Sequence, residues 1–134
     1  MFFGGARWVR YHQTKLANAV FVHTLAEKLK AKGSKVKALC AAPGLAATNL
    51  QVTTANDGGF SSSFIMRWAQ SAEDGTMSLL QCCAAPGVES GELWEPSVMT
   101  GPTHRVAMEK ICTDPKAGKT LWEESEKACG AWAL

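Results

Sequence analysis

The sequence predicts an α/β fold built around a short parallel sheet, and two neighbouring segments carry that prediction. The first, His12–Lys32, contains no Gly or Pro and repeats apolar residues every three or four positions, which is the period of an amphipathic helix. The second, Lys35–Ala42, becomes continuously small and apolar before Pro43-Gly44, as a buried strand of a parallel sheet does. A helix joined to a buried strand through Gly33-Ser34 is an αβ unit.

Length and composition favour a single globular domain over residues 1–134. The chain is 46% hydrophobic and 19% charged, which excludes a disordered or collagen-like class. Its net charge of +2 is too small to favour a nucleic-acid partner, and its apolar runs are too short for a membrane span. Five cysteines without regular spacing indicate reduced thiols in an intracellular compartment.

The middle of the chain predicts a loop followed by a helix. Thr48–Ser62 is rich in Thr, Asn, Asp, Gly and Ser, so we expect a long loop there, with Phe64–Ala69 as a short helix within or after it. Ser71 begins a capping-box pattern, which predicts a helix that runs to about Ala84 and ends at Pro86-Gly87.

The last third predicts one strand and one helix. Gly91–Trp94 has strand character, and Pro96 limits its length. Thr113-Asp114-Pro115 offers a cap followed by Pro, so we expect a final helix from there to about Cys129. The prediction therefore holds only two strands, too few for a covered parallel sheet, and we expect another protein chain to complete or cover it.

The lysines at the end of the first helix have two interpretations. They suit the negative end of the helix dipole as an ordinary solvated helix end, or they form a phosphate-binding patch; they are Lys28, Lys30 and Lys32.

One pair of residues suggests acid–base chemistry. Tyr11 is the only tyrosine, and Lys15 follows it four positions later, so both side chains project from one face of the predicted helix. A lysine held there favours the phenolate, which makes Tyr11 a candidate proton donor to a carbonyl oxygen or acceptor from a hydroxyl. The alternative is an aromatic residue at a helix start beside a surface lysine.

The neighbours of this pair resemble a known family. Tyr11–Asn18 is similar to the Tyr-x-x-Ser-Lys-x-x-Asn segment of short-chain dehydrogenases/reductases, with Thr14 where Ser is commoner. Pro43–Thr48 resembles the Pro-Gly-x-x-x-Thr turn of the same family. Three later segments resemble its retinol-dehydrogenase-like branch: Ser71–Ala84, Ser90–Pro96 and Leu121–Glu126.

This resemblance implies a fold, an activity and a set of site residues. The fold would be the C-terminal portion of a doubly wound, Rossmann-like parallel sheet, incomplete without an N-terminal nucleotide-binding half. Tyr11 would be the catalytic acid/base, and Lys15 would bind the nicotinamide ribose of NADP or NAD and lower the pKa of Tyr11. Pro43 and Gly44 would turn the chain beside the cofactor, and Thr48 would hydrogen-bond it.

The resemblance also implies a mobile substrate lid, Leu50–Arg67, and an apolar small-molecule substrate. Apolar residues in and after this segment suit such a substrate, but they equally suit an ordinary core or a partner interface; they are Phe60, Phe64, Ile65, Met66 and Trp68.

Two parts of the family's machinery have no counterpart in the sequence. No segment matches the Gly-x-x-x-Gly-x-Gly phosphate loop, since Gly87 and Gly91 have its first spacing but Leu93 follows. The central Asn-Asn-Ala-Gly segment and the catalytic Ser, expected upstream of Tyr11, are missing too. We therefore expect the chain to be inactive alone: a fragment of a reductase, a half completed by another chain, or a structural subunit that has lost its chemistry.

Other chemistry finds little support in the sequence. The histidines are scattered, and Cys82-Cys83 are adjacent rather than at zinc-finger spacing, so we expect no metal site. Neighbouring cysteines within a helix are expected to be buried small apolar residues.

Overall fold

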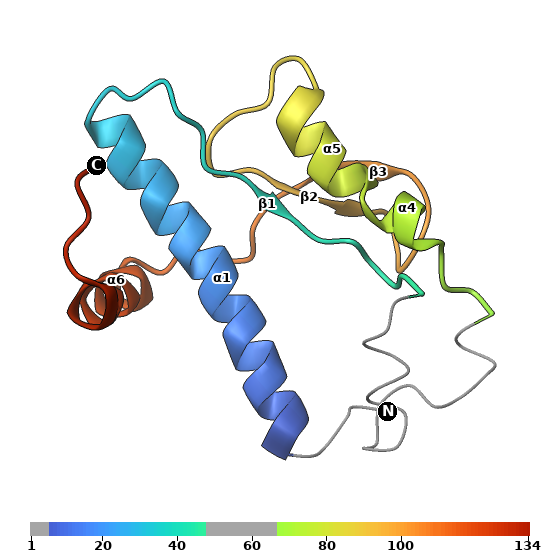
Figure 1. Cartoon of the computed structure of the whole chain (residues 1–134), viewed down its shortest axis with the longest axis horizontal. Helices are drawn as coiled ribbons and strands as arrows, with labels where there is room; N and C mark the ends of the chain where they lie inside the picture. Colours follow the sequence, from blue (N-terminus) through green and yellow to red (C-terminus); the bar gives the residue numbers. More distant parts are fainter. Residues whose placement is uncertain (1–5, 48–66) are drawn as a thin grey trace.

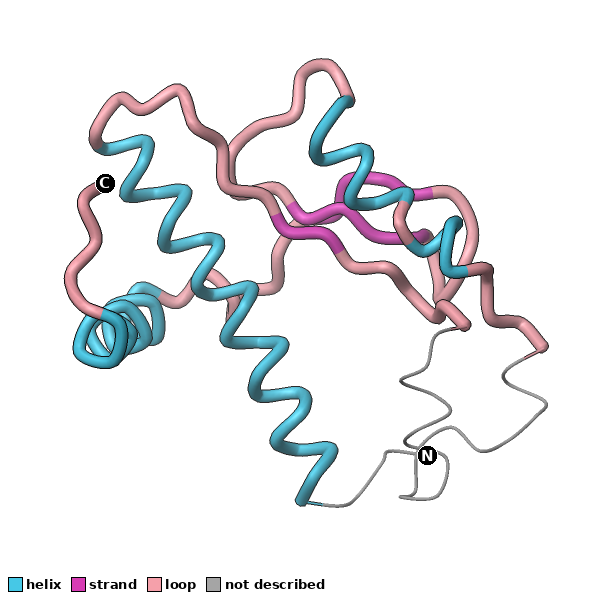
Figure 2. The backbone as a smooth tube through the Cα atoms, viewed as in Figure 1, coloured by secondary structure: helices cyan, strands magenta, loops and turns pink. Residues whose placement is uncertain are grey.

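The computed structural model describes residues 6–47 and 67–134 (Figure 1). The elements are, in order, α1 (Ala6–Ala31), β1 (Cys40–Ala41), α4 (Ala72–Gly75), α5 (Met77–Ala84), β2 (Leu93–Pro96), β3 (Thr103–Val106) and α6 (Pro115–Cys129). The strands form one small sheet, and much of the rest is helix and loop (Figure 2). None of the helices in the described ranges is long and apolar enough to cross a membrane.

The predicted long helix is confirmed and begins earlier than expected, at Ala6. It ends because Gly33 adopts a φ of +65°, which lets the amide of Ser34 donate to the carbonyl of Leu29 at 3.0 Å. A left-handed glycine after the last turn satisfies helix carbonyls that would otherwise lack a partner.

The sheet corrects the expected fold class. Its order is β1-β2-β3, with β1 parallel to β2 and β2 antiparallel to β3, so it is a three-stranded mixed sheet rather than a portion of a doubly wound parallel one. The connection from β2 to β3 covers only residues 97–102. A parallel crossover needs a dozen or more residues, so a connection this short permits only an antiparallel return.

The first predicted strand is shorter than Lys35–Ala42. The amide of Val36 bonds to the hydroxyl of Ser34, and the amide of Ala38 bonds to the hydroxyl of Ser90 at 3.0 Å. Backbone bonding to the segment before β2 begins with the Ala38 carbonyl, which accepts from the amide of Gly91 at 2.7 Å, and the amide of Cys40 then donates to the carbonyl of Glu92 at 2.9 Å.

The predicted helix start is confirmed in its N-cap, Ser71, but the helix after it is divided. The hydroxyl of Ser71 accepts from the amide of Asp74, and the carboxylate of Asp74 accepts from that hydroxyl. The helix then breaks at Thr76, where α4 gives way to α5. Of the expected short helix Phe64–Ala69, residues 64–66 lie outside the described residues, and Arg67 and Trp68 form a turn.

The final helix is confirmed in its cap and its end. Asp114 accepts a hydrogen bond from the amide of Lys116, and Pro115 occupies the first turn, where a missing amide costs nothing. Gly130 follows the last helical residue with a φ of +88°.

Two contacts hold α1 in place. Its C-terminal half packs against the segment before β1 through a small buried cluster of Ala26, Leu29 and Ala38. It also crosses α6, where Gly118 fits against Thr24: a Cβ on Gly118 would lie 2.6 Å from the Thr24 hydroxyl oxygen. Close helix crossings of this kind need a residue without a side chain at the contact.

Aromatic rings surround the crossing of α1 and α6. Phe21 stacks on Trp122 with centroids 5.6 Å apart, and Trp132 meets Trp122 edge-on at 4.6 Å. The ammonium of Lys28 lies 4.6 Å from the centre of the Trp122 ring, and that of Lys32 donates to the carbonyl of Leu134. Two of the three lysines at the helix end therefore bind partners within the fold, which favours the helix-end interpretation over a phosphate patch.

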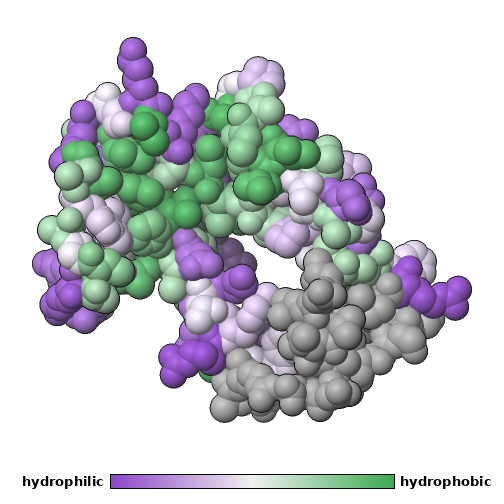
Figure 3. All heavy atoms as spheres, in the orientation of Figure 1, coloured by the Kyte–Doolittle hydropathy of each residue, from purple (hydrophilic) through white to green (hydrophobic). Residues whose placement is uncertain are grey.

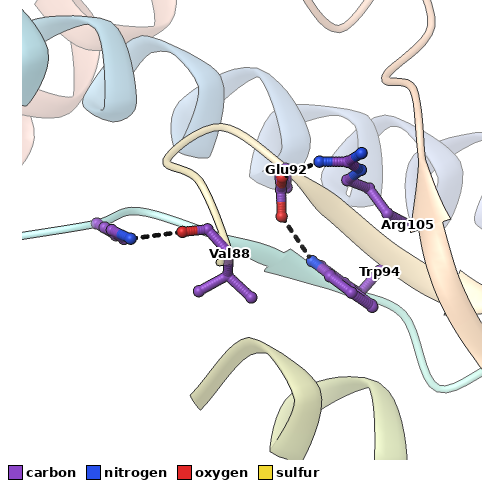
Figure 4. Close-up of polar contacts among 5 residues, drawn as sticks. Val88, Glu92, Trp94 and Arg105 are labelled. Atoms are coloured by element: carbon purple, nitrogen blue, oxygen red, sulfur yellow. Dashed lines mark hydrogen bonds and ion pairs between the residues drawn. The ribbon is translucent and has the colours of Figure 1, made fainter. Parts of the chain in front are cut away.

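A polar contact joins β2 to β3 at Glu92 (Figure 4). Arg105 donates to one oxygen of the Glu92 carboxylate at 2.8 Å, and the indole of Trp94 donates to the other at 3.0 Å. Burial of the carboxylate raises its pKa, but these donors outweigh burial and leave the pKa of Glu92 below its ordinary value.

Because the folded state lowers the pKa of Glu92, this carboxylate stabilises the protein above the ordinary glutamate pKa of about 4.3, and the contribution disappears as pH falls through the folded-state pKa. We expect wild type to exceed Glu92→Gln in free energy of unfolding at pH 7, and the difference to shrink at pH 3. Urea unfolding at both pH values measures it. Glu123→Gln, with a 55% exposed side chain, controls for loss of one acidic charge. An equal difference at both pH values would contradict this account.

Candidate functional site

One face of α1 carries both its packing and its candidate chemistry. Tyr11, Lys15, Val22, Ala26 and Leu29 are spaced by four, seven, four and three residues, which places them on the same side of a helix. In the C-terminal half this face packs against Ala38. The same face therefore continues past the packed region and presents Tyr11 and Lys15.

The N-terminal half of α1 and the chain after β1 both lead away from the contact with Ala38. Fifteen residues of helix separate Ala26 from Tyr11, a rise of about 22 Å. Six residues of extended chain separate Ala38 from Gly44, a span of about 20 Å. From the contact with Ala38 both segments run toward the same end of the fold and diverge as they go (Figure 1).

Tyr11 and Lys15 meet as their spacing predicts. The ammonium of Lys15 lies 5.4 Å from the centre of the Tyr11 ring, which is within cation–π range. Tyr11 is half-buried and Lys15 is exposed. Thr14 does not point to the phenol: its hydroxyl donates to the Tyr11 carbonyl at 2.7 Å.

Two aromatic side chains that the sequence analysis did not single out hold the Tyr11 ring. Trp8 meets it edge-on with centroids 5.6 Å apart, and His12 meets it at 5.8 Å. Trp8 and His12 also contact each other at 6.4 Å. Their spacing of three before and one after Tyr11 was visible in the sequence, and helical periodicity alone places Trp8 beside Tyr11.

Pro43 and Gly44 follow β1 just before a bend at Leu45, and packing explains the glycine. Gly44 has a φ of +68°, and a Cβ there would lie 2.4 Å from the Met99 carbonyl oxygen and 2.8 Å from the Pro96 ring. The next amide, that of Leu45, donates to the same Met99 carbonyl. The absent side chain of Gly44 thus makes room for the protein's own loop.

Gln70 joins the three segments that form this end of the fold. Its side chain donates to the Pro43 carbonyl at 2.6 Å and accepts from the amide of Gly101 at 3.2 Å. Its backbone pairs with Leu45 and Ala47. No sequence signal marked Gln70, because each of its partners is more than twenty residues away in the chain.

Part of the predicted site lies outside the described residues. Thr48 and positions 50–66 of the predicted lid, with Phe60, Phe64, Ile65 and Met66, belong to that part. Trp68, just after it, is 70% exposed.

The surroundings of three of the cysteines favour the protonated thiol. Burial raises the pKa of Cys40, of Cys82 and of Cys112, which disfavours the reactive thiolate. The expectation that both adjacent cysteines are buried is wrong for one of them, because Cys82 is buried and Cys83 is exposed on the outer side of α5. In the described ranges no three His, Cys, Asp or Glu side chains are grouped to hold a metal ion.

The described surface also has a groove of about 760 Å³ between α1 and α6, lined among others by Thr24, Lys28 and Trp122. None of the predicted site residues lines it. Its lining carries four carboxylates and two lysines, and it surrounds no cluster of side chains that indicates a ligand class.

Comparison with known proteins gives one informative likeness. No protein-family model and no curated protein matches the chain. The crystal structure of an uncharacterized protein from Mycobacterium paratuberculosis is similar, with 30% identity and a TM-score of 0.63. The match covers 90% of this chain but only 38% of the mycobacterial chain, so this protein spans well under half the length of that relative.

Two glycines with the same backbone conformation provide a matched test of the turn. A Cβ at Gly33 would meet nothing within 4 Å, and the φ there is +65°. Gly33→Ala should therefore lower the free energy of unfolding only by the cost of this backbone conformation, about 1 kcal/mol. Gly44→Ala has the same backbone cost and also places a Cβ against the Met99 carbonyl. We expect it to lower the free energy of unfolding by about 3 kcal/mol or more. Chemical denaturation measures both. Equal losses would show that the loop carrying Met99 moves away freely.

Proposed function

We propose that this chain derives from an NAD(P)-dependent oxidoreductase of the short-chain dehydrogenase/reductase type, acting on a carbonyl/alcohol pair of an apolar substrate, and that it does not turn over substrate alone. The observation that supports this most is the Tyr11–Lys15 pair, which shares one helix face and brings the ammonium within 5.4 Å of the ring centre. Tyr11 is the acid/base of the proposed reaction.

Each side chain has a defined part in the proposed proton transfer. The hydroxyl of Tyr11 gives its proton to the substrate carbonyl oxygen in reduction and takes the alcohol proton in oxidation. The ammonium of Lys15 provides positive charge beside the phenolate that forms. Trp8 and His12 contact the Tyr11 ring from two sides and restrict its rotation.

The residues present fit only one end of a dinucleotide. The exposed ammonium of Lys15 suits ribose hydroxyls, and a nicotinamide dinucleotide would supply the hydride. The diphosphate of such a cofactor is normally held by glycine-loop amides at a helix N-terminus, and the sequence has no such loop. Gly44 provides no space for it either, since the Met99 carbonyl fills the position of its Cβ.

A second candidate function is a non-catalytic structural subunit. It is favoured by the apolar surface of α5, whose residues Met77–Ala84 include no charged side chain. Leu79 is 57% exposed and Leu80 is 52% exposed, and Figure 3 shows apolar atoms on the surface over α5. An uncharged helix surface with exposed leucines is normally covered. In this role the partner is another protein chain that covers the sheet edge and α5.

A cofactor-binding measurement distinguishes an incomplete chain from a complete enzyme. We expect titration of the purified chain with NADPH and with NADH, followed by calorimetry, to give no binding in the micromolar range, because the diphosphate amides are lacking. Micromolar binding by a monodisperse monomer would contradict the proposal that the chain is incomplete.

Turnover tests the role of Tyr11. We expect a fusion with an upstream glycine-rich cofactor-binding segment to oxidise NADPH with lipophilic aldehydes or ketones. Tyr11→Phe should lower kcat by about 100-fold or more, since it removes the transferable proton. Lys15→Met should lower it as well, whereas Lys30→Met, an exposed lysine on the same helix, should leave it unchanged. If Tyr11→Phe left turnover unchanged, Tyr11 would not be the acid/base of the reaction.

A further inference from the structure

The N-terminal half of α1 lies beyond the contacts that hold the helix. Thr24 meets α6, and Ala26 and Leu29 meet the segment before β1. Tyr11 comes thirteen residues before Thr24, more than three helical turns away, where the helix extends from the sheet and from α6 (Figure 1). Among the described residues, each ring that contacts Tyr11 comes from α1 itself, as does the ammonium of Lys15. In this part of the fold the direction of the phenol depends on neighbours along the helix.

A tyrosine on a helix has two common rotamers, and they send the phenol in different directions. In helices χ1 values near 180° and near −60° are common, whereas χ1 near +60° drives the side chain into the preceding turn. In both common rotamers the side chain leans toward the helix N-terminus, over the residues three and four positions earlier. Trp8 is the residue three positions before Tyr11, so the Tyr11 ring leans toward it.

Trp8 provides a ring for Tyr11 to rest on. The two rings meet edge-on, with centroids 5.6 Å apart and planes at 75°, an arrangement that the charge distribution of aromatic rings favours. Trp8 and Tyr11 are both half-buried. Lys15, four positions after Tyr11, leans back over the Tyr11 ring in the same way. The three side chains thus follow one another along one face of the helix.

Thr14 and His12 lie close to Tyr11 but not where its ring leans. The hydroxyl of Thr14 donates to the Tyr11 carbonyl at 2.7 Å, so it binds the backbone rather than the phenol. His12 is exposed and directly follows Tyr11, and one residue along a helix turns a side chain by about 100°. Its ring therefore meets the Tyr11 ring from the side, with centroids 5.8 Å apart.

We propose that Trp8 is a positioning residue for Tyr11: it selects one rotamer of the tyrosine and so fixes where the phenol hydroxyl lies. The inference rests on the proposed function and adds to it the residue that gives the acid/base its direction. Trp8 acts only through the Tyr11 ring and takes no part in proton transfer itself. Because a misplacement of about 1 Å can cost about 100-fold in rate, the choice between the two rotamers affects turnover.

The first experiment observes the rotamer in the full chain by nuclear magnetic resonance. Tyr11 is the only tyrosine, so labelling tyrosine alone gives one set of side-chain resonances, and the three-bond couplings between its Hα and Hβ protons report χ1. We expect one dominant rotamer in wild type and in Trp8→Phe, which keeps a ring beside Tyr11, and a mixture of two in Trp8→Ala. Val9→Ala changes the adjacent side chain, which is 53% exposed, and should keep the wild-type couplings.

The second experiment measures turnover in the fused form of the chain. Trp8→Ala should lower kcat for carbonyl reduction by about tenfold and leave KM nearly unchanged, because the phenol is misplaced while the groups that bind substrate are not altered. Trp8→Phe should recover most of the lost kcat, and Val9→Ala should match wild type. Circular dichroism checks that each variant is folded. If Trp8→Ala does not fold, Trp8→Leu, which keeps an apolar side chain without a ring, replaces it in both experiments.

Two results would overturn the proposal. The first is a folded variant without a ring at position 8 whose Tyr11 couplings equal those of wild type. The second is an active fused form in which that variant leaves kcat unchanged, which would leave the acid/base role of Tyr11 standing. A wild-type fused form without turnover would count against the proposed function instead, and the couplings would still decide whether Trp8 sets the direction of Tyr11.

Discussion

The contact between α1 and the segment before β1 determines where the rest of the molecule lies. Ala26 and Leu29 pack against Ala38, and the carbonyl of Ala38 accepts from the amide of Gly91 at 2.7 Å. A Cβ on Gly91 would lie 3.6 Å from that of Ala26, so the turn before β2 also lies against the helix. Small residues at Ala26, Ala38 and Gly91 allow helix, strand and turn to meet in one place, and a larger side chain at any of these three positions would separate them.

This contact also determines which way the candidate catalytic pair points. Because Tyr11 and Lys15 continue the face that Ala26 and Leu29 begin, packing at one end of α1 fixes the direction in which the chemical pair points at the other. The turn at Gly44 is fixed separately, by Met99 and Gln70. Two independent sets of contacts thus fix the direction of the pair and the position of Gly44.

Features with local causes could be predicted from the sequence, and features with distant causes could not. Three predicted features depend only on residues within one or two helical turns. They are the long helix, predicted from its apolar period, the helix cap at Ser71, and the start of the last helix at Asp114-Pro115. The parallel sheet was wrong because β3, with the sequence Thr-His-Arg-Val, has no apolar alternation and is held by its pairing with β2. The length of β1 depends on Ser90, fifty-two residues from Ala38.

The candidate site divides in the same way. Tyr11 and Lys15 were found because they share a helix, and Gly44 because a Pro-Gly turn is a local signal. Gly44 must be glycine because the Met99 carbonyl lies where a side chain would be, and Gln70 holds the segment through its bond to the Pro43 carbonyl. Neither could be read from the residues around position 44.

The most direct test of this account is the contact between Ala38 and the buried face of α1. In a methyl-labelled sample, nuclear Overhauser effects measure proximity between the Ala38 methyl group and the methyl groups of Ala26 and Leu29. The account predicts a cross-peak from Ala38 to at least one of them, because the three form one buried cluster. A folded chain whose α1 resonances are helical but whose Ala38 methyl group shows no cross-peak to either residue would contradict it, since Tyr11 and Lys15 would then have no fixed direction relative to the Pro43-Gly44 turn.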